Sequence, residues 1–539
     1  MHRRRFRLFL SSPRTWDEML PGLMLPPARL SGVLLPVFSL RSRSDFGVGD
    51  FGAAEGFFRW LAAAGQRLWM LLPLLPTTPG DPSPYATAGS AGLNPLFIHL
   101  DWLEEYREAG GLHLLSARQA HALEAARTAP RIAYDVVFEV KRVALEAAFS
   151  HGQAHPGERN ERFERFREAE SGWLDDHALF SAIAEEQQRR PFWEWPEELA
   201  TREPGAMAAT RARLAPRIRF HSWLQWVAHE QWARVRTAAR EHHVLLCGDE
   251  PFIVGQNSSD AWAHPGLIRR DARLGVPPDA FSATGQDWGL PWFDFPAMER
   301  DGWRWLRSRA RQSATYYDLR RVDHAVGYFR QWIRDQTTPT GRFVPPDEPT
   351  QAALGETVFR VLGEGAGIVA EDLGVIPTWV RQTLERLGIP GYRVLRWERD
   401  QAQFRDPAAF PALSLVTTGT HDTETLRAWW ETSTDAERLA VATVYATFAA
   451  LRQAPAEFTP EVHEALLAAA ETSGADLCVV PWQDVLGTTE RINLPGTVQE
   501  ANWSYRMPHP VEELLAHPDT EAAAATLRRL SERGRRLAG

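Results

Sequence analysis

Three acidic residues in this sequence each end a short apolar run, as residues at the carboxyl end of a buried strand do. They are Asp323, Glu371 and Asp422. Their segments cover residues 319–324, 367–372 and 415–422. We interpret these as three consecutive strand ends separated by helices. Since strands alternating with helices favour a parallel α/β barrel, the acids are expected to meet at its active-site end.

Arg321 and Asp323 lie two residues apart, so their side chains share one face of the expected strand. A neighbouring guanidinium favours the ionised form of a carboxyl, and a nucleophile must be ionised. An isolated pair of this kind is more often a structural ion pair. The two further acids at strand ends, Glu371 and Asp422, favour a catalytic interpretation of Asp323 over a purely structural one.

The carboxyl groups of Asp323 and Glu371 are expected to lie close together. Neighbouring strands are about 4.8 Å apart, and glycoside chemistry with retention requires a nucleophile and an acid about 5–5.5 Å apart. In the run Ala370-Glu371-Asp372, neighbouring side chains point to opposite faces. One of Glu371 and Asp372 therefore faces the barrel lumen, and Asp422 could bind substrate hydroxyls.

The elements that must position these acids follow from hydrophobic patterning. Further barrel strands are predicted at 33–40, 68–75, 244–249, 391–397 and 477–481, and helices at 50–64, 377–387 and 433–474. Residues 76–95 and 275–292 read as loops rich in turn formers. Tyr85 in the first loop is either a turn filler or a ligand platform, and the residues alone do not decide between these.

Residues from about 102 to 240 interrupt the alternation of strands and helices with a series of helical patterns, and no flexible linker flanks them. We therefore predict the start of a catalytic barrel over 30–101, a helical insertion over 102–240, the rest of the barrel over 241–510 and a C-terminal helical tail over 511–539.

The composition bounds the possible functions. The chain has 539 residues and a net charge of −9, so no general attraction to nucleic acid or to an anionic membrane is expected. The only two cysteines, Cys247 and Cys478, lie in apolar runs and suggest a reducing compartment. The N-terminal apolar run is too short for a signal peptide, and no stretch is long enough to span a membrane. We expect a cytoplasmic protein.

Two motif matches fail on their context. Residues 47–52 match G-x-G-x-x-G, but no strand directly precedes them and no acid follows about 20 residues later. His229-Glu230 lacks the second histidine of a zinc-protease motif. No histidine or cysteine cluster has metal-ligand spacing, so neither a metal nor an organic cofactor is expected.

Several longer motifs make the sequence similar to the 4-α-glucanotransferase family, also called amylomaltase or disproportionating enzyme (glycoside hydrolase family 77). They are Ser83-Pro84-Tyr85, Gly92-Leu93-Asn94-Pro95, Gly248-Asp249, Ser259-Asp260-Ala261-Trp262-Ala263, Gly275-Val276-Pro277-Pro278-Asp279, Thr284-Gly285-Gln286, Trp288-Gly289, Arg321-Val322-Asp323-His324, Ala370-Glu371-Asp372-Leu373-Gly374, Gly419-Thr420-His421-Asp422, Ile492-Asn493-Leu494-Pro495-Gly496-Thr497 and Asn502-Trp503. The resemblance spans roughly residues 30–510.

The resemblance implies a (β/α)8 TIM barrel with a large, mostly helical insertion and extended active-site loops, and a retaining transferase that needs no cofactor. It implies Asp323 as nucleophile, Glu371 as general acid/base and Asp422 as transition-state stabiliser. The implied substrate-binding residues are Tyr85, Asp249, Arg321, His421, Asp279, Gln286, Trp288, His324 and Asn493. The implied partners are α-1,4-glucans and maltooligosaccharides, and the region from Asp279 to Trp288 is the implied lid.

Some positions depart from the common family pattern and bear on acceptor preference and product size. They are Ala280, Ala283, Ala325-Val326-Gly327 and Thr423. Two alternatives stay open at this point: an α-1,4-glucan hydrolase on the same barrel, and a non-catalytic glucan-binding protein. The presence of all three acids argues against a binding protein, because a site that only binds glucan needs no carboxyl prepared for proton transfer.

Overall fold

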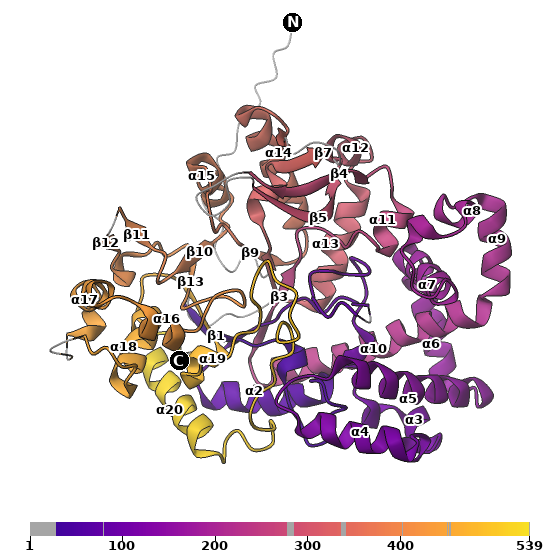
Figure 1. Ribbon diagram of the computed structural model, residues 1–539, viewed down its shortest axis with the longest axis horizontal. Coiled ribbons are helices and arrows are strands. Elements are labelled where there is room, and N and C mark those ends of the chain that lie inside the picture. Colours follow the sequence, from indigo (N-terminus) through magenta and orange to yellow (C-terminus); the bar gives the residue numbers. More distant parts are fainter. Residues whose placement is uncertain are drawn as a thin grey trace, which may run out of the picture.

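The computed structural model describes residues 29–537, except residues 79, 278–284, 336–340, 402, 450 and 452–453. Eight parallel strands form a closed barrel at its centre (Figure 1). In chain order the barrel strands are β1 (Leu30–Leu34), β2 (Leu68–Met70), β3 (Leu245–Glu250), β6 (Leu319–Val322), β9 (Gly367–Ala370), β10 (Gly391–Val394), β13 (Ser414–Thr417) and β14 (Leu477–Pro481). Each strand pairs with the next, and β14 pairs with β1 to close the ring. The predicted (β/α)8 TIM barrel is confirmed.

Helices connect the barrel strands and cover their outer surface. Outside the insertion, those of five or more residues are α2 (Ala54–Ala63), α11 (Ser259–Ala263), α12 (Phe295–Arg300), α13 (Arg304–Tyr316), α14 (Glu348–Leu362), α15 (Thr378–Arg386), α16 (Leu426–Thr432), α17 (Asp435–Val444), α18 (Pro460–Glu471), α19 (Trp482–Leu486) and α20 (Pro518–Arg533). Among the described residues, no helix combines the length and apolar character needed to cross a bilayer.

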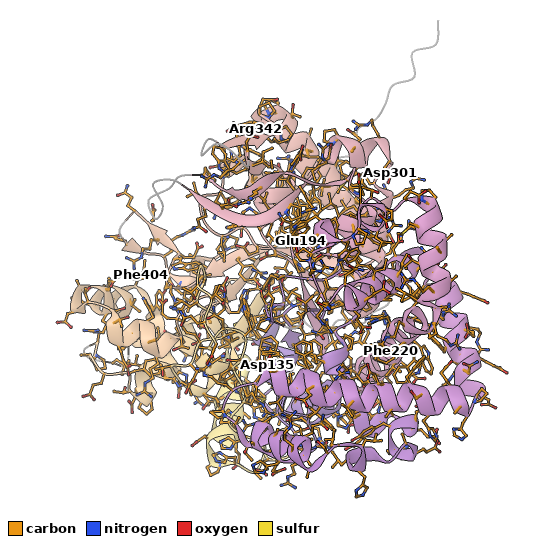
Figure 2. The ribbon with its side chains drawn as sticks, turned by 45° about the vertical axis from the view of Figure 1, so that its right-hand side comes forward. Asp135, Glu194, Phe220, Asp301, Arg342 and Phe404 are labelled. Atoms are coloured by element: carbon orange, nitrogen blue, oxygen red, sulfur yellow. The ribbon has the colours of Figure 1, made fainter. Side chains whose placement is uncertain are left out.

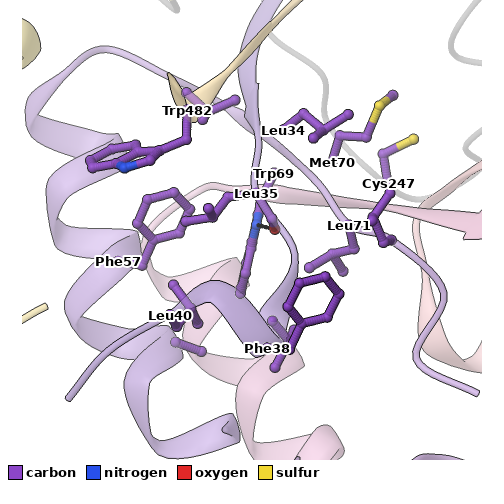
Figure 3. Close-up of a cluster of buried hydrophobic side chains, with 14 of the residues drawn as sticks. Leu34, Leu35, Phe38, Leu40, Phe57, Trp69, Met70, Leu71, Cys247 and Trp482 are labelled. Carbon is purple, nitrogen blue, oxygen red and sulfur yellow. Dashed lines mark hydrogen bonds between the residues drawn. The ribbon is translucent and has the colours of Figure 1, made fainter. Parts of the chain in front are cut away.

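The packing of α2 against the barrel shows how apolar patterning builds the core. Phe57 of α2 lies 5.2 Å from Trp69 of β2 and 5.8 Å from Trp482 of α19, between ring centroids. The buried Trp69 indole donates a 2.8 Å hydrogen bond to the Leu35 carbonyl oxygen (Figure 3). Because a buried indole N–H must find a partner, this bond fixes the ring between the barrel strands and α2.

A block of helices lies between β2 and β3 in the sequence and beside the barrel in space (Figure 1). It contains α3 (Glu104–Glu108), α4 (Ala117–Thr128), α5 (Tyr134–Ala154), α6 (Glu158–Ala169), α7 (Ser171–Glu186), α8 (Glu197–Ala200), α9 (Pro204–Arg213) and α10 (Ala215–Glu241). Figure 2 shows Asp135 and Phe220, which mark α5 and α10. The expected domain bounds remain predictions.

Strands occupy both ends of the loop expected at 275–292, and they belong to a four-stranded antiparallel sheet. It has the order β5-β4-β7-β8, with β4 (Ile268–Val276), β5 (Gln286–Phe293), β7 (Gln331–Asp335) and β8 (Gly341–Val344). Gly275 pairs with Asp287 on one side and Trp332 on the other. A Cβ there would lie 2.0 Å from the Gln286 carbonyl oxygen, so this glycine permits close strand approach. Of the two partners of β4, β5 is near in the sequence and β7 is distant, so local turn signals did not reveal the sheet.

Other strand predictions were too long or misplaced. The first two strands end at Leu34 and Met70, not at residues 40 and 75; Pro36 and Pro73 follow them, and proline supplies no ladder N–H. The strand predicted at 391–397 ends at Val394, and the helix predicted at 433–474 contains two separate α-helices, α17 and α18, with a short 3-10 helix (Ala446–Phe448) between them. Strand β10 also lies between β9 and β13. The three acid-bearing strands are therefore not consecutive.

Candidate active site

Asp323 directly follows β6 and lies against Arg321. The Arg321 Nη1 atom donates to Asp323 Oδ1 at 2.8 Å and to both carboxylate oxygens of Asp249, also at 2.8 Å. The Asp323 side chain is 25% exposed, whereas those of Arg321 and Asp249 are buried. One buried guanidinium thus orients two carboxylates, one of which remains accessible.

Glu371 follows the neighbouring strand β9. Val322 pairs with Ala370, so Asp323 and Glu371 are the next residues of two adjacent parallel strands. The Glu371 N–H donates to the Val322 carbonyl oxygen at 3.0 Å, which continues the ladder by one bond. The expected juxtaposition of these two acids at adjacent strand ends is therefore present.

Two backbone donors hold the Glu371 carboxyl. The N–H of His324 donates to Oε2 at 2.9 Å, and the N–H of Leu373 donates to Oε1 at 3.0 Å. His324 has a φ of 44°, a left-handed conformation that non-glycine residues rarely adopt. Burial, opposed by Arg321 and reinforced by the Asp323 charge, raises the pKa of Glu371 to about 7. A carboxyl in this range can give up and regain a proton near neutral pH.

Asp372 points away from this site, as strand alternation predicts. Its carboxylate accepts from the backbone N–H of Tyr392 at 2.6 Å and from Arg381 Nε at 3.0 Å. The structure therefore assigns Glu371 to the site and Asp372 to the packing between β9, β10 and α15.

Asp422 lies beyond β13 and is held by neighbours on both sides. Asn493 Nδ2 donates to Oδ1 at 2.6 Å, and His421 Nε2 lies 3.4 Å from Oδ2. Burial alone would raise the pKa of Asp422, but His421, Asn493 and Arg321 lower it to about 2. The carboxylate is therefore ionised across the physiological range, as a stabiliser of positive charge must be.

Tyr85 joins the Asp249 and Asp422 groups. Its hydroxyl donates to Asp249 Oδ2 at 2.6 Å, and its ring stacks on His421 with centroids 5.1 Å apart. Trp503 packs against both rings, with centroids 5.7 Å from Tyr85 and 5.8 Å from His421. The structure thus brings Tyr85, from a loop that the sequence left ambiguous, into the site.

Two residues of the expected lid lie on β5, and one of them contacts His324. The Trp288 ring of β5 lies 4.9 Å from the His324 ring, and Phe252 packs on the same ring at 5.5 Å. Gln286, also on β5, accepts a 3.3 Å hydrogen bond from the Trp288 indole. Asp279 lies outside the described residues.

Sequence reasoning did not select Arg491 and Trp503 as site residues. Arg491 Nη2 donates to the Asp422 carbonyl oxygen at 2.6 Å, and no spacing in the sequence pointed to that contact. Trp503 was within a recognised motif, which was the one available signal. Trp397, which is 52% exposed, lies three residues after the end of β10. Strand β10 is the barrel strand between β9 and β13.

The arrangement supplies an accessible carboxylate beside a guanidinium, a carboxyl with a pKa near neutrality, and an ionised third acid. This set suits acid/base and nucleophilic chemistry at a sugar carbon. Among the described residues, the one group of three potential metal ligands within reach of one another is His509, His517 and Asp519, and none of them belongs to this site.

Several known 4-alpha-glucanotransferases are similar to this chain over most of its length. The sequence profile of the 4-alpha-glucanotransferase family matches residues 35–512. The chain is 34% identical to the 4-alpha-glucanotransferase of Synechocystis sp. over 500 residues, 89% of this chain and 94% of that one. It is 34% identical to that of Thermus thermophilus over 507 residues, 90% and 94% of the two chains.

The fold gives the same result. The structure resembles the amylomaltase from Streptococcus agalactiae, solved in complex with acarbose, with a TM-score of 0.80 and 27% identity over 94% of this chain and 99% of that one. The profile match and the relatives cover nearly all of this chain, including β6, β9 and β13 with their acids. This chain therefore belongs to the 4-alpha-glucanotransferase family.

Proposed function

We propose that this transferase moves segments of α-1,4-glucans and maltooligosaccharides to the 4-hydroxyl of an acceptor glucan or of glucose, with retention, through a covalent glycosyl-enzyme intermediate. The observation that supports this best is the pair Asp323 and Glu371 at adjacent strand ends. One carboxylate contacts Arg321, and the other carboxyl has its pKa raised to about 7. Neighbouring strand ends correspond to about the 5 Å separation used for retention.

In the first step, Asp323 attacks the anomeric carbon of the donor while Glu371 protonates the leaving glycosidic oxygen. A shorter glucan leaves with that proton, and the segment stays esterified to Asp323. In the second step, Glu371 removes the proton from the acceptor 4-hydroxyl, whose oxygen displaces Asp323. Two inversions give net retention.

The ester also prepares Glu371 for its second role. The negative charge of Asp323 is one of the causes that raise the pKa of Glu371. Ester formation removes that charge, so the pKa of Glu371 falls when it must act as a base. Asp422 remains ionised and stabilises positive charge at the anomeric carbon in both steps.

The remaining site residues suit binding of the sugar that reacts. Asp249 and His421 are held by Tyr85, and their polar atoms lie around the same barrel mouth as Asp323. The Streptococcus agalactiae amylomaltase was solved with acarbose, and its fold match spans these strands. We assign Tyr85, Asp249, Arg321 and His421 to the donor side and the β5 residues Gln286 and Trp288 to the acceptor side.

Incubation with maltotriose tests the substrate assignment. Glucose together with maltopentaose and longer chains, at a constant number of reducing ends, is expected. Rising reducing ends with only shorter products would refute transfer as the main reaction.

Trapping tests the covalent step. α-Maltotriosyl fluoride needs no acid for departure of fluoride, so E371Q should accumulate a glycosyl-enzyme whose intact mass rises by one maltotriosyl unit. The matched control is D323N, which should gain no mass. A mass gain in D323N equal to that in E371Q would refute Asp323 as the nucleophile.

We also propose a cytoplasmic location. Both cysteines are free thiols, buried in β3 and β14, in keeping with a reducing compartment. Recovery of the native protein chiefly in the membrane or secreted fraction of its cells would refute this.

A further inference from the structure

Asn493 is engaged with the stabilising acid rather than left free for sugar. Its Nδ2 donates to Asp422 Oδ1 at 2.6 Å, and its backbone N–H donates to the His421 carbonyl oxygen at 3.1 Å. Asn493 as a whole is only 9% exposed. The sequence resemblance had placed Asn493 among the substrate contacts.

Arg491 completes a clamp on the same turn of chain. Its Nη2 donates to the Asp422 carbonyl oxygen at 2.6 Å, and its Nε donates to the Asn493 carbonyl oxygen at 3.3 Å. The segment 491–493 therefore holds both the main chain and the carboxylate of Asp422.

Asp422 remains accessible to a substrate despite these contacts. Its side chain is 41% exposed, although one carboxylate oxygen accepts a hydrogen bond from Asn493 and the other faces His421. Each carboxylate oxygen has a second lone pair, so the carboxylate can still face a substrate. Without the Asn493 amide, only His421 at Oδ2 would restrain the carboxylate, because no other donor to Oδ1 is present among the described residues.

We propose that Asn493 is a positioning residue for the reaction, which acts through Asp422 by donating to Oδ1 and fixing the carboxylate toward the anomeric carbon. This inference rests on the proposed function, in which Asp422 stabilises the transition state. It assigns to Asn493 an effect on the chemical step rather than on substrate affinity.

The isosteric variant N493D tests the contact directly. It replaces the amide donor by a second carboxylate about as close to Asp422 as the 2.6 Å of the present bond. Two carboxylates at hydrogen-bond distance cannot both ionise without repulsion, and they share a proton at lower pH. The other charged groups facing this pair are His421 beside it, Arg321 from β6, Arg491 on the clamp, and Asp249 opposite His421.

The expected result is a shifted pH profile. At pH 7, kcat for maltotriose disproportionation should fall about 10–100-fold, the range expected for loss of a hydrogen bond to a charged group. Activity should recover as the pH is lowered, so that the alkaline limb lies at more acidic pH than in the wild type. A kcat profile that keeps the wild-type shape, with the same fractional loss at every pH, would overturn the proposal.

Asn502 offers a matched control in the same loop. Its side chain accepts from the Leu494 N–H at 3.1 Å and donates to the Thr497 carbonyl oxygen at 2.9 Å, and none of its hydrogen bonds reaches Asp422. N502D makes the same chemical change and should keep the wild-type shape of the pH profile, whatever its effect on loop stability. Equal shifts in N493D and N502D would overturn the proposal.

A second variant covers a failure of N493D to fold. N493A should lower kcat about 10–100-fold and leave KM for maltotriose within about threefold, because the interaction is proposed to act in the transition state. A raised KM with unchanged kcat would instead make Asn493 a substrate contact. A wild-type enzyme without disproportionation would refute the proposed function itself, and would do so before any variant is measured.

Discussion

Raising the pH above neutrality should switch off the first chemical step by ionising Glu371. Its pKa is raised to about 7 by burial and by the charge of Asp323, against the effect of Arg321. As the proposed acid, Glu371 must carry its proton when the donor binds. The active form therefore exists below this pKa and is lost as the pH rises through it.

The size of the effect follows from the titration of one group. With a pKa near 7, the protonated fraction is about nine-tenths at pH 6, about a tenth at pH 8 and about a hundredth at pH 9. The ratio kcat/KM, which reports ionisation of the free enzyme, should fall about tenfold per pH unit on this limb.

A comparison of two glycosyl donors distinguishes the titration of Glu371 from a general loss of active protein at high pH. Glucose release from low concentrations of maltotriose depends on an acid, whereas fluoride release from α-maltotriosyl fluoride does not. The alkaline limb should be present in kcat/KM for maltotriose and absent in that for the fluoride. Equal limbs for both donors, or a flat maltotriose profile up to pH 9, would refute the assignment of Glu371.

Removing the Asp323 charge gives a further check on the same reasoning. In D323N the pKa of Glu371 should be lower than in the wild type, because Asp323 raises it. A carbon-13 NMR titration of the Glu371 carboxyl measures this in an enzyme that does not turn over. An unchanged or higher pKa would contradict the proposed exchange of acid and base roles.

Four other predictions concern single side chains. D323N should retain less than about 1% of maltotriose turnover, and a variant that keeps more than a few per cent would exclude Asp323 as nucleophile. R321K should lose at least about 100-fold in kcat/KM, because lysine cannot replace the guanidinium that contacts Asp249 and Asp323; near-normal kinetics would contradict this. Y85F should lose about tenfold in kcat/KM with the loss of the 2.6 Å bond to Asp249, and an unchanged ratio would show that only the ring matters. W288A should raise the acceptor KM and the share of hydrolysis, measured as reducing ends per transfer, since it removes the ring that packs on His324; an unchanged share would separate the lid from water exclusion.

Much of the barrel could be predicted from local pattern. The apolar runs that precede Asp323 and Glu371 are β6 and β9, and both acids follow directly after them. The helical stretch between β2 and β3 was also visible, because helical patterns occur in it, as at 134–149 and 220–241. Strand lengths were less predictable, since proline ends the strand pairing of β1 and β2 earlier than their apolar runs end.

The region of the expected lid and the third acid were harder to place. Residues 275–276 and 286–292 form strands in which β4 pairs with β5 and with the distant β7. The pairing of β4 with β7 joins residues far apart in the chain, so a local window contains no record of it. The strand predicted at 415–422 ends at Thr417, and Asp422 is held instead by side-chain contacts with Asn493 and His421.

The sequence by itself determined the family and the barrel, and it singled out three acids as catalytic candidates, because these depend on residue types and local spacing. Only the tertiary structure decided which acid of the pair Glu371 and Asp372 faces the site, how Arg321 divides its contacts between two carboxylates, and that Asn493 binds Asp422. The raised pKa of Glu371 also depends on burial and on a charge from another strand. Protonation and orientation are set by neighbours in space, and those neighbours are brought together only by folding.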